Sequence, residues 1–132
     1  MVGSEGEVRA GPSNGGALGS PNASEELAPP KPGQVVMRVH RIRGEVVIAA
    51  CDSELVETEL RVGKSPVKIS SHFYGRIAVS QEEFVAQVRR GTIVNLLGER
   101  TIGWAVRAGL LPAEGAGNLG GVPHAEIVDL PR

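Results

Sequence analysis

The stretch EVVIAAC, residues 45–51, constrains the fold of this chain more than any other. Every position from Val46 to Cys51 is apolar, so both faces of an extended segment here would be apolar. Such a strand is typical of the interior of a sheet that is covered on both sides. The preceding stretch, VVMRVHRI at 35–42, is joined to it by Arg43-Gly44, where glycine permits the positive φ of a tight turn. The two stretches therefore predict a β-hairpin whose second strand is central.

The first predicted helix covers residues 81–90. Ser80 and Glu83 have the spacing of a capping box. In this motif the Ser80 side chain accepts a hydrogen bond from the Glu83 amide, and the Glu83 side chain reaches back to the Ser80 amide. Phe84, Val85 and Val88 then fall on one side of the helix, and we expect them to face the core.

A second helix is predicted from Thr92, as its cap, to about Ala108, where Gly109 supplies a stop. Its apolar positions recur at helical spacing: Ile93, Leu96, Leu97, Trp104 and Ala105.

Two further extended segments complete the predicted fold. VKIS at 67–70 follows a turn at Lys64-Ser65-Pro66, and VPHAEIVDL follows the glycine-rich residues 115–121. Strands first, helices next and one strand at the end predict an α+β domain over residues 35–132. We expect a mixed sheet of about four strands, with two main helices against one face and part of the other face covered.

The first 34 residues have a different composition, rich in Gly, Pro and Ser. A segment with so few large apolar side chains buries too little surface to offset its conformational entropy, so we expect a disordered tail. Met37 opens the changed composition, which raises the hypothesis of a misplaced upstream start codon.

Composition excludes several classes of protein. The net charge of −1 does not fit a generally basic protein that coats nucleic acid, and the one cysteine excludes an internal disulfide framework. His40, His72 and His124 are too scattered for a metal site, and we expect neither a metal nor a cofactor. No apolar run has membrane-spanning length, and no signal peptide is recognisable, so we expect a cytoplasmic protein without a membrane partner.

A small set of residues could carry catalysis or hold a ligand. Cys51 and Asp52 end the predicted central strand, where sites collect in α/β proteins, and a thiol nucleophile at Cys51 would need a nearby base such as His124 or His72. The alternatives are an inert buried thiol for Cys51 and a helix cap for Asp52. A ligand patch is predicted from Asn95 and Glu99, one helical turn apart, together with Gly120, Gly121 and His124.

Basic residues suggest a second kind of site. One set lies on the first strand and its turn, a second on the helices, and a third in the loop SSHFYGR, where an exposed tyrosine could stack on a base. If these sets share a surface, they form an anion-binding face that suits RNA: Arg38, Arg41 and Arg43, then Arg89, Arg90 and Arg100, then Tyr74 and Arg76. An ion-paired solvated surface explains the same residues nearly as well.

Four stretches, taken in order, resemble the archaeal family known as domain of unknown function 424. They are MRVHRIRGEVVIAACDSEL, HFYGR, TIVNLLGERTIGWAVRAGLL and GGVPHAEIVDL, and the most specific parts are ACD, FYG, NLLGER and GGVPHA. The likeness covers residues 37 to about 130. It implies an archaeal cytoplasmic protein whose domain begins near Met37, and it transfers no catalytic residue.

Three functions follow from these observations. The leading hypothesis is a non-enzymatic binding module that contacts RNA or a ribonucleoprotein, such as a ribosomal subunit, in translation. The alternative is a small enzyme or ligand-binding protein that uses Asp52, Glu99 and His124 around a glycine-lined pocket. The third is a structural subunit that packs against a protein partner.

Overall fold

The structure is a computed structural model, and it describes residues 30–128. The predicted disordered tail, residues 1–34, therefore lies mostly outside the described residues. The elements follow one another as β2 Val35–Ile42, β3 Glu45–Asp52, the 3-10 turn η1 Ser53–Leu55, β4 Glu59–Val62, β5 Ser65–Lys68, α2 Ser71–Tyr74, β6 Ala78–Val79, α3 Gln81–Val88, β7 Ile93–Leu97, α4 Glu99–Arg107, β8 Gly117–Leu119 and β9 Val122–Val128.

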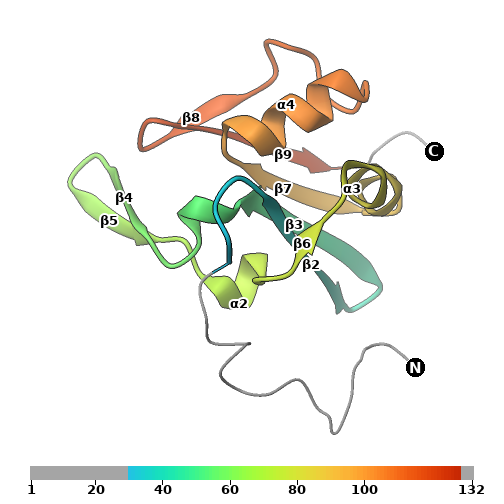
Figure 1. Cartoon of the computed structure of the whole chain (residues 1–132), viewed down its shortest axis with the longest axis horizontal. Coiled ribbons are helices and arrows are strands. Elements are labelled where there is room, and N and C mark those ends of the chain that lie inside the picture. The colour runs from blue at the N-terminus through green and yellow to red at the C-terminus, as the bar shows by residue number, and fades with distance from the viewer. Residues whose placement is uncertain (1–29, 129–132) are drawn as a thin grey trace, which may run out of the picture.

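A mixed six-stranded sheet forms the centre of the α+β domain, in the order β6-β2-β3-β7-β9-β8 (Figure 1). Strand β3 pairs antiparallel with β2 and parallel with β7, and its residues 48–51 are fully buried. The predicted hairpin and its central strand are therefore confirmed. The main sheet has six strands rather than about four. β6 and β8 are too short to show a period of two in the sequence, and β7 lies in the segment predicted as a helix, whereas the predicted strand at 67–70 belongs to the separate β4–β5 sheet.

The predicted helix over residues 93–108 is wrong in its first half. Residues 93–97 form β7, between β3 and β9, and the helix α4 begins only at Glu99. The five residues IVNLL are apolar at four positions, which fits a buried strand as well as a helix. Thr92 caps no helix: its Oγ1 accepts a 2.9 Å hydrogen bond from the Val46 N–H, which ties the start of β7 to the start of β3.

Helices α3 and α4 share one face of the sheet. Phe84 and Val88 of α3 are fully buried there with Ile48 and Leu96 of the sheet, as predicted, and Val85 packs against them. The cap of α3 is also confirmed, because the Glu83 N–H donates to Ser80 Oγ at 3.0 Å.

The opposite face is partly covered by smaller elements. Tyr74 of α2 is buried there with Cys51 and Leu97, and the β4–β5 hairpin closes this second cluster through Leu60 and Val67. Figure 1 shows that the hairpin projects from the main sheet. The predicted strand at 67–70 is displaced, since β5 is Ser65–Lys68 and Gly63-Lys64 form the turn.

Candidate functional site

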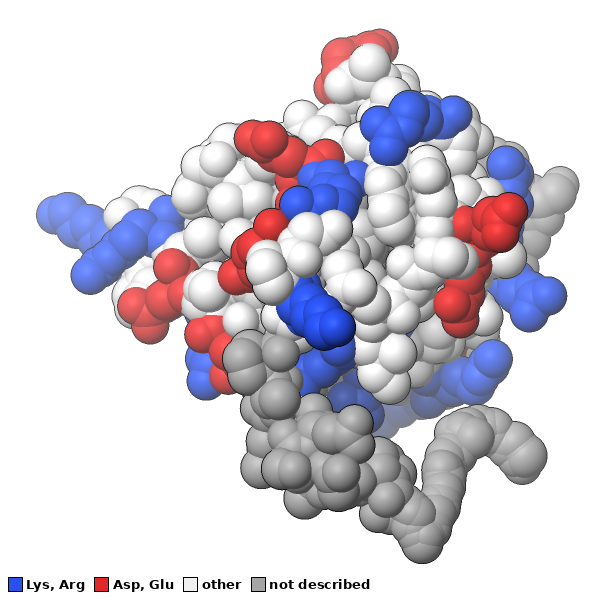
Figure 2. All heavy atoms as spheres, viewed as in Figure 1, with Lys and Arg blue, Asp and Glu red and all other residues white. Residues whose placement is uncertain are grey.

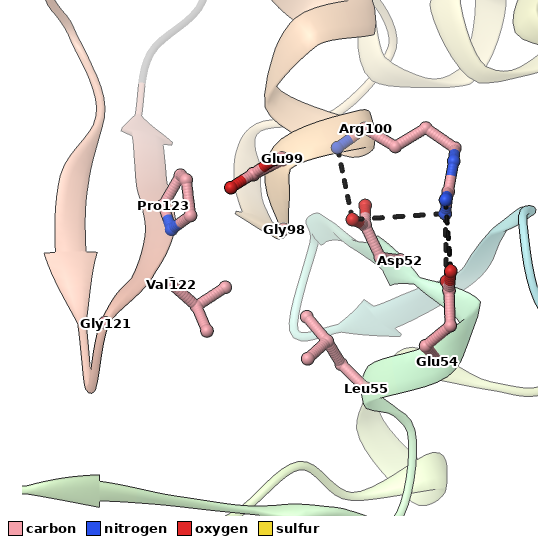
Figure 3. A pocket seen from close by; sticks show the side chains of 9 residues that line it. All are labelled: Asp52, Glu54, Leu55, Gly98, Glu99, Arg100, Gly121, Val122 and Pro123. Atoms are coloured by element: carbon pink, nitrogen blue, oxygen red, sulfur yellow. Dashed lines mark hydrogen bonds and ion pairs between the residues drawn. The ribbon is translucent and has the colours of Figure 1, made fainter.

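A cleft lies at the carboxyl ends of the parallel strands β3 and β7 (Figure 3). Its volume is about 580 Å³. Three segments line it: Asp52, Glu54 and Leu55 at the end of β3 and in η1, Gly98, Glu99 and Arg100 at the start of α4, and Gly121, Val122 and Pro123 at the β8–β9 turn. Two predicted site residues, Asp52 and Glu99, therefore share a cleft with one predicted glycine, Gly121.

Asp52 caps helix α4 from a different strand. Its Oδ1 accepts from the Thr101 N–H and the Thr101 hydroxyl, both at 2.8 Å, and its Oδ2 accepts from the Arg100 N–H at 3.1 Å. These are amides of the first helical turn, which have no partner within the helix. The carboxylate replaces the capping side chain that Gly98 lacks, and a Cβ at Gly98 would overlap it. The interpretation of Asp52 as a helix cap is correct, but the helix begins 47 positions further along the chain.

Arg100 holds the rim of the cleft together. Its Nη1 and Nη2 donate to the two carboxylate oxygens of Glu54 at 2.9 and 3.1 Å, and Nη1 also donates to the Gln34 carbonyl at 2.9 Å. The hydrogen bond from Arg100 lowers the pKa of Glu54 to about 2. The predicted RNA contact at Arg100 therefore meets a guanidinium that already binds η1 to Gln34, the residue before β2.

The β8–β9 turn forms the opposite wall of the cleft. Gly120 has a φ of +59°, and a Cβ there would come within 2.7 Å of the Arg61 carbonyl oxygen of β4. Gly120 therefore allows the turn to approach the β4–β5 hairpin, and Gly121 donates its N–H to Asn118 Oδ1 at 2.8 Å. At Gly120, a residue of the predicted ligand patch, the close backbone approach is to β4 of the same chain rather than to a ligand.

The remaining candidates for catalysis and ligand binding lie elsewhere. His124 is opposite Leu97 in the β7–β9 pairing and does not line the cleft, and Asn95 lies in mid-strand opposite Glu126. The predicted helical pairing of Asn95 with Glu99 is wrong, because β7 ends between them. Cys51 is fully buried, and burial raises the pKa of its thiol to about 12, so it stays protonated at neutral pH.

Two further residues of the predicted RNA set have structural roles. The prediction that Tyr74 is exposed is wrong: its side chain is only 7% exposed, because a core with few aromatic residues includes it. Burial raises the pKa of Tyr74 to about 12. Arg38 Nη1 donates a 3.2 Å hydrogen bond to the carbonyl oxygen of His72, a residue of α2, and so connects β2 to α2. Arg76 also takes part in an interaction within the molecule.

The other four arginines come together at the amino ends of β3 and β7. Arg41 lies opposite Val46, Arg43 is in the β2–β3 turn, and Arg89 and Arg90 follow α3 immediately before β7. The Thr92–Val46 hydrogen bonds hold the two segments side by side. We name these four residues the basic end.

Sequence reasoning missed Glu54, Leu55, Val122 and Pro123 as residues of the cleft. Gly98, next to Glu99, marks a helix start only once residues 93–97 are recognised as a strand. In residues 30–128, no cluster of three or more His, Cys, Asp or Glu side chains could hold a metal ion. None of the described helices is long and apolar enough to cross a membrane.

The fold and the cleft define a small α+β domain with a mixed sheet and a helix capped across strands. The chain belongs to the family described as Protein of unknown function (DUF424), whose model matches residues 40–130. It is similar to an uncharacterized conserved protein from Methanopyrus kandleri, known from a crystal structure. That likeness has a TM-score of 0.68 at 30% identity and covers 76% of this chain and 95% of the other. A comparison with curated proteins finds no match.

Proposed function

We propose that this chain is a non-enzymatic, cytoplasmic binding module that contacts RNA, or the RNA of a ribonucleoprotein such as a ribosomal subunit, through the basic end. The observation that carries the proposal is the convergence of Arg41, Arg43, Arg89 and Arg90 at one end of the sheet. Arginine suits this role because its planar guanidinium can bind phosphate through two parallel hydrogen bonds.

The charge around the basic end favours an anionic partner. No ion pair or side-chain hydrogen bond joins the four guanidinium groups to the described part of the chain. The acidic residues of α3, Glu82 and Glu83, lie in its first turn, at the other end of the helix. The face in Figure 2 has interspersed basic and acidic side chains, so the proposal concerns one end of the domain and not a broad basic surface.

A matched pair of double variants tests the proposal in the full chain. In Arg89→Ala/Arg90→Ala, we expect the affinity for a fluorescent single-stranded RNA to fall about tenfold, which corresponds to about 1.4 kcal/mol for two phosphate contacts. In the control, Arg61→Ala/Lys64→Ala on the β4–β5 hairpin, the net charge changes equally and the affinity should stay within about twofold. Equal losses in the two variants would show that net charge, not the basic end, governs binding.

The cleft favours a second candidate, a small-ligand site. The alternative hypothesis from the sequence is a glycine-lined pocket with Asp52, Glu99 and His124. Asp52, Glu99 and Gly121 do line the cleft, but His124 does not. Glu99 is exposed and forms no ion pair with the described residues, and its side chain lies between the start of α4 and Pro123 (Figure 3). If a small molecule binds in the cleft, an NMR screen should find compounds that change the amide chemical shifts of Glu99 and Gly121 together. Chemical-shift changes at the basic end alone would contradict a ligand site in the cleft.

A further inference from the structure

The outer edge of β2 is only partly paired. Strand β6 pairs with Val35 and Val36, and the pairing ends where the Met37 N–H donates to the Ile77 carbonyl at 3.2 Å. Successive residues of a strand direct their N–H and C=O groups to opposite sides. Val39 and Arg41 therefore direct theirs outward, to the same side as Met37.

These outward groups have no partner in the described part of the chain. No backbone or side-chain hydrogen bond within residues 30–128 reaches the N–H or C=O of Val39 or Arg41 on that side. In Figure 1 the β2–β3 hairpin continues past the short β6. The stretch from Val39 to Ile42 is thus an open sheet edge, which can template an added strand.

Exposed apolar side chains flank this edge. Ile77, at the end of the β6 pairing, is 75% exposed, and Ile42, at the end of β2, is 55% exposed. They are two of the four large apolar side chains that are exposed among the described residues. An added strand could cover them with alternate aliphatic side chains.

The charge of the edge selects the kind of partner. Arg38 and Arg41 are exposed on β2 and Arg43 follows in the turn, whereas Glu45 is the one acidic side chain of the hairpin before Asp52. A second copy paired through the same edge would place the arginines of both copies along one seam, where like charges destabilise pairing. A partner with carboxylates would instead meet opposite charge.

We propose that the outer edge of β2, residues 39–42, binds an extended acidic segment of another protein as an additional strand. The backbone of Val39 and Arg41 supplies the hydrogen bonds, Ile42 and Ile77 receive aliphatic side chains, and the arginines attract the carboxylates. The inference goes beyond RNA binding. Because Arg41 belongs to both surfaces, RNA and the peptide should weaken each other's binding.

Amide hydrogen exchange of the full chain, followed by NMR, tests this directly. The probe is an eight-residue peptide of alternating glutamate and valine with blocked ends, and the control replaces each glutamate with lysine. At about ten times its Kd, the acidic peptide should slow exchange at Val39 and Arg41 about tenfold. The amides of Arg38 and His40, which face β3, should change little.

Three results would overturn the proposal. The acidic peptide could leave both amides unchanged up to millimolar concentration, or the lysine peptide could protect them equally. Protection could also arise without peptide as the protein concentration rises, which would identify a second copy as the occupant.

Two substitutions at one position separate backbone pairing from charge. Arg41→Ala removes the guanidinium, whereas Arg41→Pro also removes an N–H that makes no hydrogen bond within the described chain. Circular dichroism should show both variants folded. We expect Arg41→Ala to weaken binding of the labelled acidic peptide and Arg41→Pro to abolish it, while equal affinities of the two variants would contradict strand addition.

Discussion

At the scale of single residues, the contact between Asp52 and Gly98 determines how α4 begins. Asp52 supplies a carboxylate to the first amides of the helix, and Gly98 leaves the space for it at a φ of +111°. The sequence suggests a capping role for Asp52, because Asp is a favoured cap. It does not indicate which helix is capped, since the partner amides are 48 and 49 residues away.

Replacing Gly98 therefore tests this arrangement. Gly98→Ala should lower the free energy of unfolding by about 2–4 kcal/mol, because it combines backbone strain with loss of the cap. Urea denaturation measures this. Gly109→Ala is the matched control: Gly109 also has a positive φ, +75°, but a Cβ there would meet no atom within 4 Å. This control should cost about 1 kcal/mol, and similar costs at both glycines would contradict the cap.

The ion pair of Glu54 with Arg100 predicts a pH dependence of stability. The pKa of Glu54 is lower in the folded chain, about 2, than in the unfolded chain, so the pair contributes fully above pH 4.5 and is lost as pH falls towards 2. The carboxylate is partly exposed, so solvent screening limits the contribution to about 1 kcal/mol. The difference in unfolding free energy between the native chain and Glu54→Gln should shrink from pH 5 to pH 2. A difference that stays constant over this range would exclude the ion pair as its source.

At the scale of elements, the fold was predictable where one pattern had one explanation. The β2–β3 hairpin has a turn glycine and an apolar run too short for a helix, and α3 has its capping residues and one apolar side. The β7–α4 segment failed because apolar residues at 93, 96 and 97 fit either a helix or a buried strand. Only tertiary contacts with β3 and β9 decide between them.

The burial of β3 predicts the reactivity of its cysteine. Cys51 should not react with a thiol reagent at pH 8 in the native chain, because the thiol is fully buried with a pKa of about 12. In urea it should react at the rate of a free thiol in a short peptide. The native labelling rate should therefore follow the population of unfolded chain, and rapid labelling under native conditions would contradict a central position for β3.

At the scale of the whole molecule, different surfaces lie at the two ends of the parallel strands. The carboxyl ends of β3 and β7 hold the cleft, where three carboxylates lie near one arginine, and the amino ends hold the basic end. Of the residues that the sequence predicts for a site, Asp52, Glu99 and Gly121 lie at the cleft and the four arginines lie at the basic end. The sequence did not separate these arginines from Arg38 and Arg100, because the partners of those two come from distant segments.

The salt dependence of RNA binding tests the central claim most directly. If the four arginines of the basic end each neutralise one phosphate of a single-stranded RNA, the plot of log K against log salt should have a slope of about −3. Affinity should then fall about 50-fold between 50 and 200 mM salt. In Arg89→Ala/Arg90→Ala the slope should fall to about −1.4. No measurable binding at 50 mM salt, or a slope that the double variant leaves unchanged, would contradict the account.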